Sequence, residues 1–348
     1  MKIIHTGDIH IGSAFAGLTR EKSALRRAEI LECFCKLCAY AKQSGVEAVL
    51  IAGDLFDSVS LYDGVKKEVF TAMANASPVR FFYSAGNHDY DERVFTLAPE
   101  NFYTLSDFER YSLSDKVVVS GCSLSRLQFS RFPFEKNAYN IFLLHGDLGT
   151  EIPLSAVQDR GIDYLALGHI HKPTTVKERL DGRGFYRYCG CLEGRGFDEV
   201  GARGFFLLDV VDGKLKDEKF LSFGKRTVRC KEADISACKG YMDLERAVEN
   251  AVRGIPESDF VKVVLTGSFL PTLKKDVALL SAKLSQRFFF ARVEDKSKLF
   301  IDYRDYEKDL TERGEFVREV GKYEMNADLR AEILEVGLKA LSGEEIDL

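Results

Sequence analysis

Short apolar runs recur along the first half of the chain, and each one ends at a glycine flanked by polar residues. The runs read "KIIHTGDIH", "VEAVLIAGDLFD", "VRFFYSAGNHD", "NIFLLHGD" and "YLALGHIH". Between the first three lie the stretches 20–44 and 62–76, in which apolar residues recur every three or four positions, as in amphipathic helices. Buried strands that alternate with helices predict a layered α/β fold. Because functional side chains in such folds gather beyond the carboxyl ends of the strands, these five strand ends should face one crevice.

The pattern changes after residue 171. The runs "GFYRYCG" and "GFFLLDVVDGKLKDEKFLSF" predict short strands, the second a hairpin that turns at Asp212-Gly213. We expect these strands to complete a second sheet. From Gly224 onward, a strand, helix, strand, helix, strand pattern predicts a separate small α/β domain. The expected organisation is a first domain over 1–223, a second over 224–300, and a C-terminal segment over 301–348.

The C-terminal segment is helical by pattern and acidic. Residues 303–348 carry 13 Asp and Glu against 7 Lys and Arg. Apolar residues spaced four, four and three positions apart fall on one face of the predicted helix: Met325, Leu329, Ile333 and Val336. Two interpretations stay open, because this face could pack on the protein's own core or dock on a partner.

Charge and composition exclude several classes of protein. The net charge of -5 argues against a globally basic nucleic-acid binder, although the acidic C-terminal segment leaves the rest of the chain almost neutral. One basic cluster could still meet phosphates: Lys225, Arg226, Arg229 and Lys231. No apolar run approaches the ~18 residues of a membrane span, and the N-terminus lacks the apolar stretch of a signal peptide. We therefore expect a cytoplasmic protein with no membrane association.

The 8 cysteines in 348 residues do not form the framework of a small secreted domain, and we expect all of them to be reduced. The Cys189-Gly-Cys191 pair could serve a metal or redox site. That interpretation is disfavoured, because no second pair of Cys or His stands at zinc-like spacing.

Histidines are scarce and unevenly placed. Of the 6 in the chain, all but His5 fall at the predicted strand ends. Aspartates and an asparagine join them at the same level, so that seven side chains should face one point: Asp8, His10, Asp54, Asn87, His145, His169 and His171. So many imidazoles and carboxylates repel one another or stay unsatisfied unless cations hold them together. The sequence therefore predicts a metal centre.

The number and spacing of these side chains favour two ions. Seven ligands are too many for one tetrahedral zinc, but they suit two ions about 3.5–4 Å apart that share a bridging carboxylate, a geometry used in phosphoester cleavage. In an extended "DIH" or "HIH", residues i and i+2 lie on the same side, so one tripeptide can supply two ligands. We expect the glycines before Asp8, Asp54, Asn87 and His169 to let the backbone turn sharply.

In order along the chain, "GDIH", "GDLFD", "GNHD", "HGD" and "GHIH" resemble the five motifs of the calcineurin-like metallophosphoesterases and cover residues 7–171. The segments "DIHIGS", "GHIHKP" and "GRGFDEVGARGFFLLDV" are similar to those of bacterial SbcD-type nuclease subunits and their relatives in the meiotic-recombination nuclease family. This resemblance implies a four-layer α/β/β/α sandwich, followed by a small α/β capping domain and C-terminal helices.

The resemblance also implies roles for individual residues. One ion would be held by Asp8, His10 and His171, the other by Asn87, His145 and His169, with Asp54 as the bridge. His88 would then be free to protonate or stabilise the departing oxygen, oriented by Asp89. The family usually prefers Mn2+, although the ligand types also allow Fe or Zn. Archaeal and eukaryotic relatives often carry a second histidine where this chain has Asp57, so the role of that histidine does not carry over.

The implied function is a Mn2+-dependent nuclease acting on DNA ends, a 3′–5′ exonuclease with single-strand endonuclease activity. Relatives act as dimers and bind a coiled-coil, SMC-like ATPase through their C-terminal helices, which implies work at the nucleoid. Two alternatives stay open. The chain could cleave another phosphoester, such as a cyclic nucleotide or a phosphoprotein, although a protein phosphatase would read "GNHE" where this chain has Asp89. It could also be a DNA-end scaffold with a vestigial site, although its ligands are intact.

Several residues also have plainer interpretations. His5 sits inside a strand and should pack or orient a ligand. Asp57 and Asp147 could support ligands or simply form turns. Six arginines could follow a phosphate backbone or lie on the solvated surface: Arg126, Arg131, Arg183, Arg187, Arg195 and Arg203. The sequence does not identify individual DNA-contacting residues.

Overall fold

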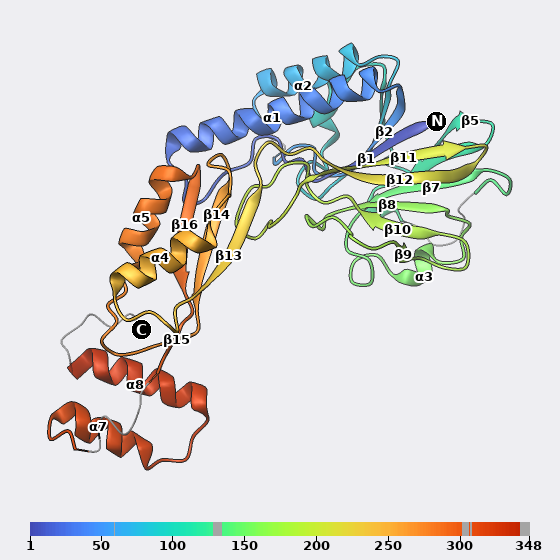
Figure 1. The fold of residues 1–348 in the computed structure, drawn as a ribbon. Helices are drawn as coiled ribbons and strands as arrows, with labels where there is room; N and C mark the ends of the chain where they lie inside the picture. The colour runs from blue at the N-terminus through green and yellow to red at the C-terminus, as the bar shows by residue number, and fades with distance from the viewer. Residues whose placement is uncertain (59, 128–133, 301–305, 307, 342–348) are drawn as a thin grey trace. The chain divides into compact units, whose positions relative to one another are not determined.

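The computed structural model (Figure 1) describes residues 1–58, 60–127, 134–300, 306 and 308–341. It divides into two compact units, Met1–Thr227 and Val228–Leu348.

The first unit contains two six-stranded sheets. The first sheet has the order β12-β11-β1-β2-β3-β4, in which β1 to β4 are parallel and β11 is antiparallel to β1. Its strands are β1 (Lys2–Thr6), β2 (Val46–Ala52), β3 (Arg80–Ser84), β4 (Phe102–Thr104), β11 (Gly204–Val211) and β12 (Lys214–Ser222).

The second sheet has the order β5-β6-β7-β8-β10-β9. The four inner strands are parallel, and the edge strands β5 and β9 are antiparallel to their neighbours. Its strands are β5 (Glu109–Ser114), β6 (Val117–Gly121), β7 (Tyr139–His145), β8 (Tyr164–Gly168), β9 (Glu178–Arg179) and β10 (Phe185–Tyr188). Short 3-10 turns cover Glu92–Phe95 and Leu124–Arg126.

Helices cover the outer faces of the two sheets, which pack on each other. Helices α1 (Arg20–Gln43) and α2 (Asp63–Asn75) lie over the first sheet (Figure 1), near the predicted bounds. The residues between the sheets form a second core, and the four-residue helix α3 (Leu154–Val157) packs against β7 and β8 on the far side. The predicted α/β/β/α sandwich is confirmed, with its fourth layer reduced to α3 and loops.

One strand prediction is wrong in part. The hairpin β11-β12 turns at Asp212-Gly213 as expected, but it extends the first sheet, and only β10 joins the second. Strand β11 pairs with the free edge of β1, where Phe205 enters the helix-side core and Phe206 enters the core between the sheets. A strand that is buried on both faces has a continuous apolar sequence. Such a sequence does not indicate which of two free sheet edges the strand will pair with.

A buried ionic network ties α1 to the segments before β11 and after β12. The fully buried Arg26 donates to Glu29 at 2.6 Å, to Glu193 at 3.0 Å and to the Gly194 carbonyl at 2.8 Å. Arg226 donates to both oxygens of Glu29 at 2.8 and 2.6 Å. Burial alone would raise the pKa of Glu29, but the hydrogen bonds from Arg226 and Arg26 outweigh it and lower the pKa to about 2.

Replacing Arg26 with alanine should destabilise the protein by about 3–5 kcal/mol, because it leaves the buried carboxylates of Glu29 and Glu193 without this partner. The measurement is urea unfolding at neutral pH, with the exposed neighbour Arg27→Ala as the control. The pKa of Glu29 is lower in the folded protein than in the unfolded chain. The Glu29 carboxylate therefore stabilises the folded protein above about pH 4.3, and this contribution is lost as the pH falls towards 2. Equal midpoints for the Arg26 and Arg27 variants would contradict this account.

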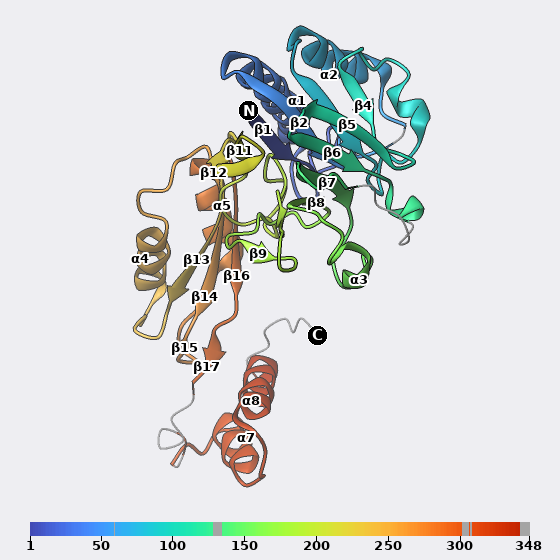
Figure 2. The same ribbon diagram turned by 90° about the vertical axis from the view of Figure 1, so that its right-hand side faces the viewer.

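The second unit is built on a parallel three-stranded sheet with the order β13-β14-β16 (Figure 2). Helices α4 and α5 supply apolar side chains to its core, and a two-stranded pair, β15-β17, follows. The bounds are β13 (Val228–Asp234), α4 (Tyr241–Ala251), β14 (Phe260–Thr266), β15 (Ser268–Phe269), α5 (Val277–Arg287), β16 (Phe290–Asp295) and β17 (Lys298–Leu299). The pattern predicts the order of β13, α4, β14, α5 and β16, but it does not predict the short strands β15 and β17.

The C-terminal helices α7 (Glu312–Gly321) and α8 (Ala327–Leu341) pack side by side in both views (Figures 1 and 2). Their shared core contains Leu334 and Leu338 of α8, while Ile333 is only partly buried and Leu329 is 46% exposed. The buried face of α8 is therefore shifted by about one residue position from the apolar face that the sequence pattern predicts. No helix in the described part of the chain combines the length and the apolar character needed to cross a membrane.

Candidate metal centre

The seven predicted ligand residues lie at the carboxyl ends of strands in both sheets of the first unit. They follow β1 (Asp8, His10), β2 (Asp54), β3 (Asn87), β7 (His145, its last residue) and β8 (His169, His171). The possible ligand atoms of Asp8, His10 and His171 lie within 4.8 Å of one another, and so do those of Asp8, Asp54 and His145. The fold thus gathers residues that are up to 163 positions apart in the sequence.

His169 contacts this cluster through both its backbone amide and its imidazole ring. Its amide N–H donates to the two carboxylate oxygens of Asp8 at 2.9 and 3.0 Å. Its ring packs edge-on against His145, with 5.2 Å between ring centroids. Its Nε2 lies 3.6 Å from the carboxylate of Glu151, a residue that the sequence did not single out. His169 therefore stands at the rim of the cluster.

The backbone is strained at this point. Asp8, His10, Asp54 and His169 have φ angles of 47°, 49°, 48° and 92°. Positive φ is uncommon outside glycine and costs of order 1–3 kcal/mol per residue, so it persists only where surrounding contacts enforce it. Here the amide of Asp8 donates to the Gly53 carbonyl at 3.1 Å, and the amide of His10 donates to the Asp54 carbonyl at 2.9 Å. Strain concentrated on predicted ligands indicates a functional site.

The motif glycines serve the site in two different ways. Gly53 has a φ of 79°, and a β-carbon there would also overlap the His145 ring, so the predicted sharp turn holds at this position. Gly86 has no positive φ. A β-carbon at Gly86 would overlap the carboxylate of Asp54, so the requirement there is close approach of the backbone and not dihedral freedom.

Hydrogen bonds on the outer ring nitrogens fix which atom of each histidine faces the centre. Nδ1 of His145 lies 2.9 Å from the Ala52 carbonyl, which can only accept, so Nδ1 carries the proton. Burial lowers the pKa of His145, which keeps the ring neutral and leaves a lone pair on Nε2. That nitrogen faces the amide oxygen of Asn87 at 3.0 Å and a carboxylate oxygen of Asp54 at 3.5 Å.

His10 and His171 repeat this arrangement. Nδ1 of His10 lies 3.0 Å from a carboxylate oxygen of Asp57, and Nδ1 of His171 lies 2.8 Å from a carboxylate oxygen of Glu199. The two Nε2 atoms then face each other at 3.1 Å, with Asp54 Oδ2 3.6 Å from that of His10. Burial lowers the pKa of His10, which keeps its ring neutral. Lone pairs aimed at one another across this distance repel unless a cation lies between them.

The donor set fits divalent cations. Burial raises the pKa of Asp8 well above its usual range, and the nearby charge of Asp54 adds to this effect. A bound cation would reverse that shift and satisfy the converging lone pairs of the imidazoles. Imidazole nitrogens combined with carboxylate and amide oxygens are ligands for Mn, Fe and Zn ions.

Two residues that support the centre follow β10 in the chain. Glu199, which is 3% exposed, accepts the Nδ1–H of His171, and Arg195 donates to the same carboxylate oxygen at 3.1 Å. Burial alone would raise the pKa of Glu199, but the bond from His171 and the charge of Arg195 lower it to about 2. Arg195 also lies 2.9 Å from Nδ1 of His171 and 3.4 Å from Asp57. Sequence reasoning named Arg195 only as one of six arginines and missed Glu199, although both stand in the segment "GRGFDEVGARGFFLLDV".

His88 lies beside the cluster, and its expected partner needs correction. The ring is exposed, packs edge-on against His10 with centroids 4.8 Å apart, and donates through Nδ1 to the Asp57 carbonyl at 3.0 Å. Asp89 is buried instead, where it accepts from the Phe56 amide at 2.9 Å and from the Tyr83 hydroxyl. Burial raises the pKa of Asp89 to about 6. Asp89 thus braces the loop after β2, while the Asp57 carbonyl takes the predicted role of orienting His88.

The other singled-out residues lie apart from the cluster. His5 is buried and bonds the Tyr164 hydroxyl at 2.7 Å, which makes it a packing residue between the sheets. All eight cysteines are free, as expected. Most of the named arginines pair with carboxylates or are buried: Arg126 with Asp107, Arg183 with Asp163, Arg187 with Glu218, and Arg203 at 3% exposure. Arg131 lies outside the described residues.

Residues 1–173 match the calcineurin-like phosphoesterase family. The chain belongs to this family. Its members include hydrolases of phosphoesters, and the converging donor atoms of the present chain are a candidate metal-binding site within that family's domain.

Curated relatives of this calcineurin-like phosphoesterase are named as nucleases and DNA repair proteins. It is 27% identical over 308 residues to the DNA double-strand break repair protein Mre11 of Methanopyrus kandleri, covering 76% of this chain and 64% of that protein. It is 26% identical over 304 residues to one of the subunits of the nuclease SbcCD of Bacillus subtilis, covering 70% of this chain and 75% of that protein. The chain thus spans less than two thirds of the Methanopyrus protein. Among solved structures, a dimetal phosphatase from Danio rerio aligns with 60% of this chain and 91% of its own, at a TM-score of 0.42 and 10% identity.

Proposed function

We propose that this chain is a Mn2+-dependent DNA nuclease that acts on DNA ends in repair and recombination. It would be a 3′–5′ exonuclease with single-strand endonuclease activity. The observation that carries the proposal is the set of imidazole, amide and carboxylate donor atoms that converge within 3.0–3.6 Å of one another at the strand ends. The names of the relatives, a nuclease component and a double-strand break repair protein, support DNA as the substrate.

We assign two divalent cations to the centre, most simply Mn2+, with Fe or Zn as chemically allowed substitutes. One cation would bind Asp8, His10 and His171, the other Asn87, His145 and His169, and Asp54 would bridge them. The short distances of Asp54 to both His10 and His145, 3.6 and 3.5 Å, support the bridging position. When bound, such ions polarise a phosphoryl group and activate water at neutral pH.

The protein's own groups would orient the centre and move a proton. Glu199 and Asp57 hold the rings of His171 and His10 through Nδ1, which keeps each Nε2 directed inward. His88 is the proposed catalytic residue. With Nδ1 donating to the Asp57 carbonyl, only Nε2 can gain and release a proton, so Nε2 is the atom that would protonate the departing oxygen of the cleaved strand.

The assembly would be a homodimer bound to a coiled-coil, SMC-like ATPase and working at the nucleoid. Two features support such a partner. The Bacillus relative is named as one of the subunits of a nuclease. Helix α8 also leaves Leu329 46% exposed beside the acidic residues of the C-terminal segment, although its main apolar face is covered by α7. We assign ATPase binding to residues 301–348 and substrate capping to 224–300.

Mn2+-loaded protein should degrade end-labelled blunt duplex DNA, and EDTA should abolish the reaction. The measurement is gel electrophoresis of 3′- and 5′-labelled duplexes and of a circular single strand, with bis(p-nitrophenyl) phosphate as a generic phosphodiester. Cleavage that starts at the 3′ end, together with nicking of the circle, is the expected result. Turnover of the generic ester with no cleavage of either DNA would reject DNA as the substrate and leave a phosphoesterase of another specificity. Failure on all three substrates despite bound Mn2+ would favour a scaffold.

A further inference from the structure

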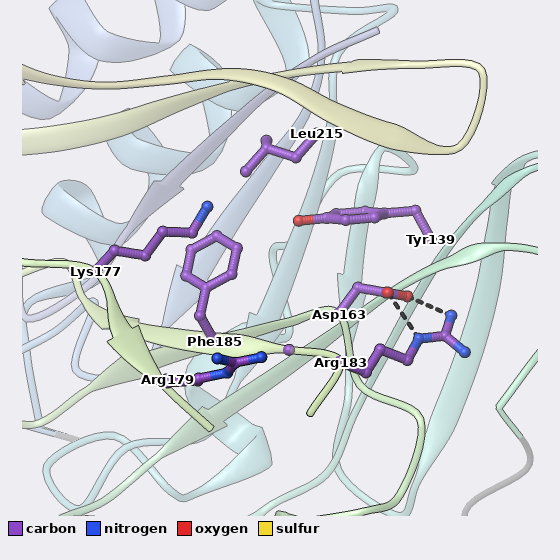
Figure 3. Close-up of a pocket in the computed structure, with 8 residues that line it drawn as sticks. Tyr139, Asp163, Lys177, Arg179, Arg183, Phe185 and Leu215 are labelled. Carbon is purple, nitrogen blue, oxygen red and sulfur yellow. Dashed lines mark hydrogen bonds and ion pairs between the residues drawn. The ribbon is translucent and has the colours of Figure 1, made fainter. Parts of the chain in front are cut away.

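A cavity, drawn in Figure 3, lies at the end of the second sheet where β7 begins. Tyr139 begins β7 and lines this cavity, whereas His145 ends the same strand at the metal centre. At about 3.3 Å per residue, the six steps along β7 from Tyr139 to His145 separate the two places by about 20 Å. The cavity has a volume of about 400 Å³, and its lining residues all belong to the first unit.

The lining carries an excess of positive charge. Three cationic side chains line the cavity, Lys177, Arg179 and Arg183, against one carboxylate, Asp163. Arg183 is committed to that carboxylate, since it donates to both oxygens at 2.7 Å and points away from the open space (Figure 3). In the described part of the chain, Arg179 donates only to two backbone carbonyls, those of Asp181 and Gly182, at 3.0 and 3.4 Å. Its charge is therefore not neutralised by a carboxylate.

Lys177 is held over the cavity by an aromatic ring. Its ammonium lies 3.7 Å from the centroid of Phe185 and 3.9 Å from Glu218. Glu218 is itself engaged by the guanidinium of Arg187, so it neutralises Lys177 only weakly. Two cationic groups, at Lys177 and Arg179, are thus available to an anion that enters the cavity.

The cavity also offers a hydroxyl and an apolar wall. Tyr139 is 6% exposed, and its hydroxyl has no hydrogen-bond partner among the described residues. Figure 3 shows this hydroxyl pointing towards the space in front of Phe185, below Leu215. A buried hydroxyl without a partner costs about 1–3 kcal/mol, which a ligand atom in the cavity would recover. The Lys177 ammonium covers the Phe185 ring in this structure, and once it moves to a bound phosphate the ring and the side chain of Leu215 supply a surface for a flat, apolar group.

We propose that this cavity binds a nucleotide, with the phosphate at Lys177 and Arg179, the base against Phe185 and Leu215, and the Tyr139 hydroxyl bonded to a polar atom of the ligand. A nucleotide combines the dianion and the planar ring that the lining complements. The same chemistry is found in a free nucleoside monophosphate and in the 5′-phosphorylated end of a DNA strand. The cavity is separate from the metal centre, so the proposal does not depend on nuclease activity.

The test is binding of adenosine 5′-monophosphate to the full chain by isothermal titration calorimetry, in EDTA so that the metal centre does not contribute. Wild-type protein should bind the nucleotide at least tenfold more tightly than inorganic phosphate or adenosine. Arg179→Ala should weaken binding at least tenfold. Arg80→Ala is the matched control, because Arg80 also donates to two backbone carbonyls of the first unit, at 3.3 Å, and lies outside the cavity. Wild-type affinity in Arg179→Ala, or equal affinity for phosphate and nucleotide, would overturn the proposal.

Tyr139→Phe separates ligand binding from a structural role. Loss of the hydroxyl should weaken nucleotide binding about three- to tenfold, while the thermal midpoint without ligand stays unchanged or rises, because an unsatisfied buried group is removed. Unchanged affinity with a lower midpoint would assign the hydroxyl to the fold and contradict the proposal. Competition then identifies the source of the ligand. Displacement of the nucleotide by a 5′-phosphorylated hexanucleotide would indicate strand ends, and lack of displacement would indicate free nucleotides.

Discussion

Replacing His88 with alanine is expected to lower DNA cleavage by about 10²- to 10⁴-fold while the bound Mn2+ per chain stays the same. The two effects separate because His88 touches the cluster in two ways. Its amide N–H donates to Asp54 at 2.9 Å, and alanine retains that bond. Its ring is exposed, with Nδ1 fixed by the Asp57 carbonyl and Nε2 left for proton transfer. The measurements are the cleavage rate on end-labelled DNA and the metal content of the dialysed protein.

The leaving group distinguishes acid catalysis from a positioning effect. A DNA strand departs as an alkoxide that needs a proton, whereas p-nitrophenolate departs readily without one. The His88 variant should therefore lose far less activity on bis(p-nitrophenyl) phosphate than on DNA. An equal loss on both substrates would mean that His88 positions the phosphoryl group and does not supply the proton. Loss of bound metal would instead make His88 a ligand and refute its role as the acid.

The candidate site was largely predictable because its residues occur in short local motifs. Asp8, His10 and Asp54 stand immediately after buried strands, and parallel strands deliver their carboxyl ends to the same edge. Glu199 was not predictable in this way. It reaches the ring of His171 from 28 positions further along the chain, after β10 has crossed the sheet. A carboxylate in a loop carries no periodic signal, and only the path of the chain shows which ring it meets.

The fold shows the same division between local and long-range information. The helices α1 and α2 end close to their predicted bounds, because apolar spacing is a local property. The hairpin β11-β12 was correctly located but assigned to the wrong sheet, since the free edge of β1 competes with the edge of the second sheet. The prediction that Asp89 orients His88 is wrong for a related reason. It adjoins His88 in sequence, yet its carboxylate turns to Tyr83 and Phe56 in the interior.

Replacing Asp54 with asparagine is expected to lower cleavage by about 10³-fold or more and to remove the stabilisation of the fold by Mn2+. At an ion concentration 100 times its dissociation constant, wild-type protein should gain about 2.7 kcal/mol, which is roughly 5–10 °C in the midpoint of thermal unfolding for a unit of this size. Asparagine preserves the shape of Asp54 but removes the charge that would bridge the cations.

The metal-free proteins provide the sharper comparison. Without cations, the 2% exposed carboxylate of Asp54 faces the lone pairs of His10 and His145 at 3.6 and 3.5 Å. An amide can donate a hydrogen bond there, so Asp54→Asn in EDTA should unfold at the same temperature as wild type or higher. Asp147→Asn is the control, because Asp147 follows the same strand as His145 but bonds to Thr150 at 2.7 Å. An Asp54 variant that keeps the full Mn2+ shift would show that the bridging position belongs to another residue, since a cation held elsewhere would not depend on this charge.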